Sequence, residues 1–308
     1  MQGFRVGHIT DLELVTGCTV FLFEEKNRAI ASIRGGAPGS RELGTLAPGN
    51  LVEGVNAVVW SGGSAPGLAT CDGVSTYLQE KGEGFSTRGG SIPIVAGAVI
   101  YDLEAGEPVS PTAEWGYRSC LAASHTPLQG SVGAGSGAVV GKYRGMDKAV
   151  KGGFGHSNAR LRGKEVDFFV VTNAMGDIYH PVSGELLAGS LHGESMRGFF
   201  NGFLSTSKFS FHTTLTLGIL HFSLSREDLS ALAGVVHSAL ATSIRPYGTL
   251  YDGDVVILVS RGRGQCSYFS QLRLIYQAVG QAVVNSVENA IAAGGIPSRS
   301  DIIQQANT

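Results

Sequence analysis

Short runs of apolar and β-branched residues recur along the chain, and they constrain its fold more than any other feature. Each run is nearly continuous rather than alternating, which indicates strands in a sheet that is covered on both faces. The runs are also too short and too interrupted to cross a bilayer as helices. Those predicted to form buried strands are Thr19–Phe23, Asn56–Trp60, Val95–Ile100, Phe168–Thr172, Thr213–Leu220 and Val255–Ser260.

Helical patterns lie between these runs. Gly67–Lys81 follows a glycine-rich turn, and Arg273–Ala293 is a long amphipathic segment that ends at a glycine. Residues Ser225–Thr242 begin with a serine suited to be the N-cap and carry Asp228 at the third helical position, a variant of the capping box. The alternation of strands and helices predicts a layered α/β protein.

Charge and composition exclude several classes of function. The 308 residues carry a formal net charge of −2 without a run of basic residues, which argues against a nucleic-acid surface or a polybasic membrane patch. The N-terminus lacks an apolar signal segment, so we expect a cytoplasmic protein. No histidine spacing and no C-x-x-C pair fits a metal site, and we expect the four cysteines to be buried thiols.

The segment Gly184–His212 differs in composition from the rest of the chain. It is rich in Ser, Gly and Phe, it has no steady period, and it ends where the strand Thr213–Leu220 begins. Long segments of this kind inside a compact domain are usually functional or disordered. We therefore predict a flexible linker over 184–212 that leads directly into a buried strand.

Glycine makes up 45 of the 308 residues, about twice the usual share, and two glycine clusters are similar to ligand-binding loops. Gly133–Ala138 fits G-x-G-x-x-A, but no strand precedes it and no helix start follows, so close backbone packing is the preferred interpretation. Ser61, Gly62, Gly63 and Ser64 lie between a predicted strand and a helix. Their N–H groups could form an oxyanion or carboxylate site, or the segment could be a plain turn.

Several polar residues beside the predicted strands could carry chemistry. Asp252 and Asp254, separated by one glycine, are either part of a tight turn or a pair of carboxylates with divided roles. Lys142 is either solvated or a proton-transfer group beside a hydroxyl. Asn173 directly follows a predicted strand and is either a turn residue or an amide that donates a hydrogen bond to developing negative charge. Tyr101 ends another apolar run, where it either packs at the edge of the core or donates a hydrogen bond to an oxyanion.

Taken in order, these segments resemble the self-processing aminopeptidases and amidases typified by L-aminopeptidase D-Ala-esterase, β-peptidyl aminopeptidases and nylon-oligomer hydrolase. The resemblance runs through most of the chain and rests on the order and spacing of its motifs. The motifs are Val6–Asp11, Thr16–Thr19, Gly35–Glu42, Val59–Leu68, Asp72–Gly73, Ile92–Val95, Val99–Leu103, Gly133–Gly137, Lys151–Gly155, Val171–Ala174, Thr213–Thr214 and Asp252–Asp254.

The resemblance implies an αββα sandwich, a single domain over residues 1–308 made of two autoproteolytic fragments. The precursor would cut its own backbone between His212 and Thr213, into residues 1–212 and 213–308. Thr213 would then be the N-terminal nucleophile of the second fragment, and its free α-amine would serve as the general base.

The resemblance also implies roles for the other candidate residues. Those that match the groups supporting the threonine in the nylon-hydrolase branch are Lys142, Asn173, Asp252 and Asp254. Spacing favours Lys142 over Lys151 for this role. The Asp-Gly-Asp sequence points to this branch, because the aminopeptidase branch carries Ser-Gly-Glu. Tyr101 matches a family tyrosine near the substrate carbonyl, so that Tyr101 and Asn173, with backbone N–H groups of the Ser61–Gly67 loop, would stabilise the oxyanion.

The chain departs from the family pattern in several places. His212 stands where Asn or Gly is usual, His221–Phe222 replaces an Asp/Asn-Ala pair, and Pro66 replaces an aromatic residue. The resemblance implies a short peptide or amide substrate, no cofactor or metal, and a homo-oligomer, commonly a tetramer. Two alternatives stay open: an acyl transferase similar to ornithine acetyltransferases, and an uncleaved, non-catalytic homologue.

Overall fold

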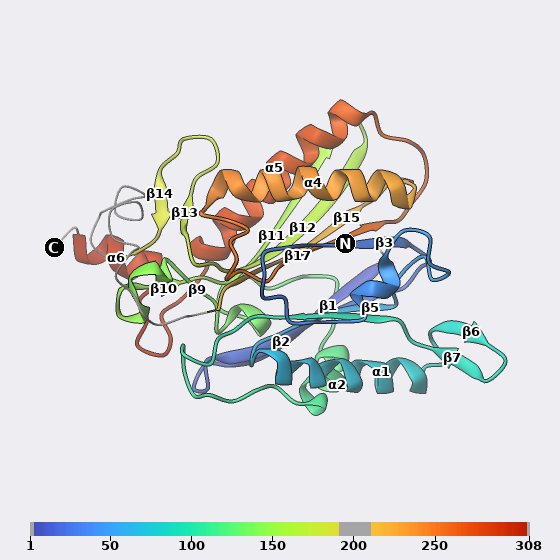
Figure 1. Cartoon of the computed structure of the whole chain (residues 1–308), viewed down its shortest axis with the longest axis horizontal. Coiled ribbons are helices and arrows are strands. Elements are labelled where there is room, and N and C mark those ends of the chain that lie inside the picture. Colours follow the sequence, from blue (N-terminus) through green and yellow to red (C-terminus); the bar gives the residue numbers. More distant parts are fainter. Residues whose placement is uncertain (1–2, 191–210, 307–308) are drawn as a thin grey trace.

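Two five-stranded sheets lie face to face in the computed structural model, which describes residues 3–190 and 211–306 (Figure 1). The strands of the first sheet, in spatial order, are β1 (Phe4–Asp11), β2 (Thr16–Phe23), β5 (Ala57–Ser61), β8 (Val95–Val99) and β4 (Ser40–Arg41). Those of the second are β11 (Phe154–Leu161), β12 (Lys164–Asn173), β15 (Thr213–Leu220), β17 (Asp254–Ser260) and β3 (Arg28–Arg34).

Helices cover the outer faces of both sheets (Figure 1). The first sheet carries α1 (Thr70–Glu80) and α2 (Ala113–Leu121), and the second carries α4 (Arg226–Ser243) and α5 (Tyr268–Glu288). A short helix, α6 (Arg299–Ala306), contacts α5. The order of layers is therefore helix, sheet, sheet, helix, and the predicted αββα sandwich is confirmed.

Short ribbons and 3₁₀ helices complete the described elements. The ribbons are β6 (Phe85–Thr87) with β7 (Gly90–Ile92), β9 (Val139–Val140) with β10 (Val150–Lys151), and β13 (Asp177–Tyr179) between β14 (Leu186–Ala188) and β16 (Ile244–Arg245). The 3₁₀ helices are η1 (Leu43–Leu46), η2 (Ala65–Ala69), η3 (Gly133–Gly135), η4 (Lys142–Arg144) and η5 (Met146–Lys148). Among the residues described, no helix is both long and apolar enough to cross a membrane.

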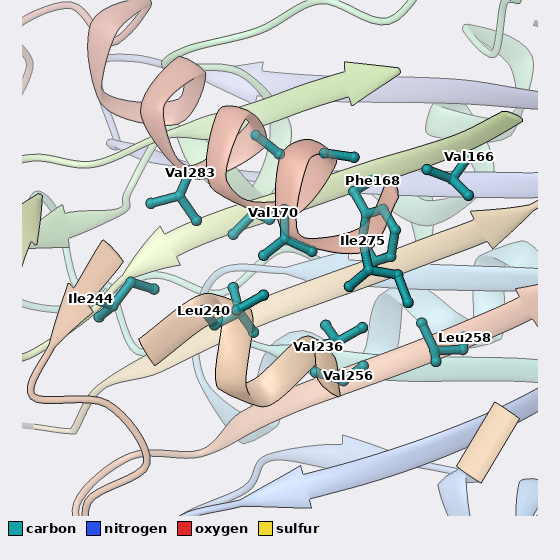
Figure 2. Close-up of a cluster of buried hydrophobic side chains, with 14 of the residues drawn as sticks. Val166, Phe168, Val170, Val236, Leu240, Ile244, Val256, Leu258, Ile275 and Val283 are labelled. Carbon is teal, nitrogen blue, oxygen red and sulfur yellow. The ribbon is translucent and has the colours of Figure 1, made fainter. Parts of the chain in front are cut away.

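Two core layers explain why the predicted strands read as continuous apolar runs. Between the sheets, Phe21 of β2 meets Phe169 of β12 with their ring centroids 5.0 Å apart. Between the second sheet and its helices, Phe168 of β12 packs in one cluster with Leu240 of α4 and Ile275 of α5 (Figure 2). Because successive residues of a strand point to opposite faces, a sheet covered on both sides needs an apolar residue at every position.

The strand β15 occupies the centre of the second sheet, and all of its residues are buried. It pairs antiparallel with β12 and parallel with β17. Its bounds match the predicted strand Thr213–Leu220. In this register Thr213 lies opposite Asn173, the last residue of β12, so two of the predicted site residues come together at one end of the sheet.

The structure also differs from the sequence-based elements. The edge strands β1, β3 and β11 are absent from the prediction because they are partly exposed and their apolar pattern is broken. The helix predicted over Arg273–Ala293 is α5, which begins earlier and ends at Glu288. After it the chain turns through Gly294 and Gly295, which have φ of 60° and 73°, values that favour glycine.

The predicted linker over 184–212 begins too early. Leu186–Ala188 forms β14, and Leu187 and Ala188 are buried in the core cluster under α4 and α5. At its other end His212 is 3% exposed and pairs with Asp252 in an isolated bridge. Residues 191–210 of the predicted linker lie outside the described residues.

The capping box predicted for α4 is present, and it allows a stability test. Ser225 Oγ accepts the Asp228 N–H at 3.1 Å, and Asp228 Oδ2 accepts the Ser225 N–H at 3.3 Å. We expect Ser225→Ala to lower the free energy of unfolding by about 1 kcal/mol, because it leaves helix N–H groups unpaired. Ser238→Ala, an exposed change within the same helix, is the matched control. Urea unfolding of both variants decides the point, and equal losses would contradict a capping role.

Candidate active site

The peptide bond between His212 and Thr213 is held on both sides by hydrogen bonds. Thr213 is 4% exposed, and its hydroxyl donates to the carbonyl oxygen of His212 at 2.6 Å. The same oxygen accepts the Gly253 N–H at 2.8 Å, and the His212 N–H donates to the Tyr251 carbonyl at 3.2 Å. The hydroxyl of the predicted nucleophile therefore lies beside the carbonyl group at the predicted cut.

Gly253 is the site residue that the sequence analysis missed. Its N–H contacts the carbonyl oxygen of His212, and a backbone N–H in that position can stabilise negative charge on the oxygen. A Cβ at this position would lie 2.4 Å from the Ala37 carbonyl oxygen, so the packing admits only glycine. The signal in the sequence is a glycine between two aspartates, which is equally typical of an ordinary turn.

The two aspartates on either side of Gly253 accept hydrogen bonds from backbone N–H groups. Asp254 Oδ1 accepts the Thr214 N–H at 2.5 Å and Oδ2 accepts the Gly248 N–H at 3.1 Å, while Asp252 Oδ2 accepts the Thr249 N–H at 2.7 Å. Burial raises the pKa of both carboxyls, and the nearby charge of Asp252 raises the pKa of Asp254 further. The pair therefore favours a single negative charge.

Lys142 and Asn173 form the other polar pair of the site. Lys142 Nζ donates to Asn173 Oδ1 at 2.8 Å and to the Asn173 carbonyl at 3.1 Å. Burial lowers the pKa of Lys142 to about 7, although the charges of Asp252, Glu104 and Asp102 act in the opposite direction. A lysine with this pKa exchanges a proton readily near neutral pH.

The predicted oxyanion donors are engaged elsewhere in this structure. Asn173 Nδ2 donates to the Tyr101 carbonyl at 3.0 Å, and the Tyr101 hydroxyl donates to Glu104 at 3.2 Å. In the Ser61–Ser64 loop, the N–H of Gly63 donates to Asp102 at 2.6 Å. The N–H groups on either side of it donate to the backbone carbonyls of residues 17 and 100. Among the described residues, Gly253 is the backbone donor on the His212 carbonyl.

The departures from the family pattern lie in three different places in the fold. The His212 ring is buried, and burial, helped by the charge of Lys142, lowers its pKa to about 2, so it is neutral. His221 lies at the other end of β15, where its Nε2 contacts the buried Asp167 Oδ2 at 2.7 Å. Pro66 lies in η2 and is exposed.

Comparisons with known proteins identify the family of the chain. The model of peptidase family S58 matches residues 1–299. The chain belongs to peptidase family S58. This S58 chain is 34% identical over 336 aligned residues to an uncharacterized aminopeptidase of Mycobacterium tuberculosis, covering 97% of this chain and 96% of that protein. It is 29% identical over 270 residues to a 6-aminohexanoate-oligomer endohydrolase of Kocuria sp., covering 84% and 73%.

Solved structures show the same fold. A β-aminopeptidase of Burkholderia sp. matches with a TM-score of 0.72 and 16% identity over 100% of the S58 chain and 92% of that chain. The L-aminopeptidase D-Ala-esterase/amidase of Ochrobactrum anthropi, described as a variant of the Ntn-hydrolase fold, matches with a TM-score of 0.71 and 15% identity over 100% and 93%. These structures show the mixed α/β fold. The family match, together with the aminopeptidase and endohydrolase relatives, shows that the S58 chain is a hydrolytic enzyme whose class of reaction is peptide or amide hydrolysis. Within the described residues, no group of three or more His, Cys, Asp and Glu side chains is placed to hold a metal ion.

Proposed function

We propose that this S58 enzyme is a self-cleaving N-terminal-threonine hydrolase of amide bonds. One observation carries the proposal: the Thr213 hydroxyl and the Gly253 N–H both donate to the His212 carbonyl oxygen, at 2.6 and 2.8 Å. A nucleophile, an electrophilic carbon and a donor for the oxyanion thus meet at one peptide bond. The names of the relatives support short peptides, amino-acid amides or ω-amino-acid oligomers as the substrate class.

Self-cleavage begins with attack of Thr213 Oγ on the carbonyl carbon of His212. The new C–O bond forms, the C–N bond breaks, and the hydroxyl proton passes to the departing Thr213 nitrogen. This leaves His212 as an ester on Oγ, and water then hydrolyses the ester to a His212 carboxylate and a free Thr213 hydroxyl. The Gly253 N–H stabilises the charge that develops on the carbonyl oxygen, an interaction typically worth about 3–4 kcal/mol in the barrier.

The proton acceptor differs between the two stages. Before the cut, the Thr213 nitrogen is part of an amide and cannot act as a base. We assign that step to Lys142. Burial lowers the pKa of Lys142 to about 7, and the charge of Lys142 lowers the pKa of His212, the residue before the cut. After the cut, the new α-amine of Thr213 has an ordinary pKa of about 8 and can take the hydroxyl proton itself. Asp252 and Asp254 then face the ammonium form and orient it.

Substrate hydrolysis repeats the same chemistry with an external amide. Thr213 Oγ attacks the substrate carbonyl, the α-amine passes the proton to the leaving amine, and the acyl group remains as an ester on Oγ. Water releases the acid and restores the hydroxyl. Transfer of the acyl group to a second amine instead of water would make the protein an acyl transferase.

A denaturing gel and mass spectrometry of the purified protein test the proposal. We expect two chains, residues 1–212 and 213–308, the second of which begins Thr-Thr-Leu-Thr. The cleaved protein is then assayed with amino-acid p-nitroanilides and 6-aminohexanoate oligomers, and separately with acetylornithine and glutamate. A single full-length chain that still hydrolyses amides would overturn the proposal. Acetyl transfer without amide hydrolysis would replace it with the transferase alternative.

A further inference from the structure

The buried carboxylate of Asp102 has no part in the chemistry described so far. Asp102 follows β8 and is 4% exposed. Its Oδ1 accepts the Gly63 N–H at 2.6 Å, and its Oδ2 accepts the Thr16 hydroxyl at 2.8 Å. A Cβ on Gly62 or on Gly137 would lie 2.1 or 2.2 Å from Oδ2. Both glycines therefore pack directly against the carboxylate, and the packing leaves no space for another side chain.

Lys151 supplies the opposite charge. It is fully buried, and its Nζ donates to the Ser136 carbonyl. Burial lowers the pKa of Lys151 to about 8, and the charge of Asp102 opposes that shift. Lys151 is the lysine that spacing did not favour for the catalytic role. A buried charge of this kind needs a nearby counter-charge to be retained.

The neighbours of Asp102 are held by further contacts, and one of these contacts reaches Asn173 of the candidate site. In the Ser61–Ser64 loop, the Gly63 carbonyl accepts the Ser110 hydroxyl at 2.7 Å, so Gly63 is held at its N–H and at its carbonyl. The residue before Asp102 is Tyr101, whose carbonyl accepts Asn173 Nδ2 at 3.0 Å. Asn173 in turn holds Lys142 and lies opposite Thr213 in the sheet.

We propose that Asp102 is a positioning residue with Lys151 as its counter-charge. Asp102 holds the Ser61–Ser64 loop in place and keeps the Tyr101 carbonyl beside Asn173. The inference rests on the proposed function, because it concerns the geometry of that reaction. The role depends on ionisation, since a carboxylate accepts both hydrogen bonds more strongly than the neutral acid does.

Burial, together with the groups that face Asp102, determines the pH at which this role is lost. The charged groups are Lys151 of β10 and Lys142 of η4, while its partners on β2 and in the loop, Thr16 and Gly63, are uncharged. Burial raises the pKa of Asp102 to about 6, although Gly63, Thr16 and Lys151 act in the opposite direction. Asp102 is therefore ionised above about pH 6, and it loses its charge as the pH falls through that value.

The test is the pH profile of kcat/KM for an amino-acid p-nitroanilide. The α-amine of Thr213 alone gives a slope of one in log kcat/KM below its pKa, and we expect Asp102 to steepen the slope to two below about pH 6. Asp102→Asn is expected to keep a slope of one down to pH 5, with kcat/KM at pH 8 lowered about tenfold to hundredfold. Lys151→Met and Thr16→Val are expected to move the break to higher pH, because each removes a group that lowers the pKa of Asp102.

Asp177→Asn is the matched control. Asp177 is another buried carboxyl whose pKa burial raises to about 6, but it accepts hydrogen bonds from Ser190 and Tyr143 and none from the Ser61–Ser64 loop. We expect this variant to keep the break near pH 6. If the break persists in Asp102→Asn, or disappears in Asp177→Asn alone, the inference is wrong. If the wild-type protein neither cuts itself nor hydrolyses amides, the proposed function fails instead, so the two failures are distinguishable.

Discussion

Replacement of Thr213 by alanine is expected to leave one full-length chain and to lower amide hydrolysis by about 10³-fold or more, the scale seen when a covalent nucleophile is removed. Both losses have one physical cause. The hydroxyl that lies 2.6 Å from the His212 carbonyl oxygen is the group that would attack first its own backbone and then the substrate. A denaturing gel reports the first loss, and initial rates with a p-nitroanilide report the second.

Two further variants separate chemistry from packing at this position. Thr213→Ser keeps the hydroxyl and should be cut and active. Thr216→Val changes another threonine of β15, whose buried hydroxyl has no hydrogen-bond partner in the described residues, so it should behave as the wild type. Full activity of an uncut Thr213→Ala protein would show that the enzyme does not use Thr213 as an N-terminal nucleophile.

Lys142→Met is expected to slow self-cleavage by at least about 10²-fold, the usual contribution of a positioned general base. The buried amine has a pKa of about 7, so it is protonated below that pH and available as a base above it. The wild-type rate should therefore rise about tenfold for each pH unit below 7 and level off above 8. Precursor made by cell-free synthesis and sampled on gels at several pH values gives these rates.

The pH dependence is the decisive readout for Lys142. In Lys142→Met the remaining slow cleavage should lose its rise through pH 7. Lys148→Met is the matched control, because Lys148 follows η4 closely and pairs with Asp147 at the surface; its cleavage should be unchanged. If the rise through pH 7 persists in Lys142→Met, the base is another group.

Patterns within short segments of the sequence predicted a central strand and the start of a helix. The strand β15 was predicted with its bounds, because eight buried residues in a row leave few alternatives for Thr213–Leu220. The start of α4 was predicted from Ser225 and Asp228, whose reciprocal hydrogen bonds depend only on residues three apart. The edge strands were not predicted, because a strand with one exposed face and few neighbours has no continuous apolar pattern.

Sequence patterns did not predict the contacts between residues of the site, because these residues are far apart in the chain. Lys142 and Asn173 are 31 residues apart, and Thr16 and Asp102 are 86 apart. Only the closure of both sheets brings such pairs together. The family resemblance identified Lys142, Asn173 and the two aspartates as a group, but it did not indicate that Asn173 is bonded to the Tyr101 carbonyl or that Gly253 donates to the His212 carbonyl.

The central place of β15 has a consequence for the cut protein. β15 and β17 belong to residues 213–308, whereas the strands that flank them, β12 and β3, belong to residues 1–212. A cut before residue 213 would leave two strands of the short chain hydrogen-bonded on both sides to strands of the long chain. The two chains could then dissociate only if the β12–β15 and β17–β3 pairings were both broken. Once denatured and diluted, they would have to find each other again in a bimolecular step. The persistence of such an enzyme is then governed by how slowly the sheet opens rather than by an equilibrium.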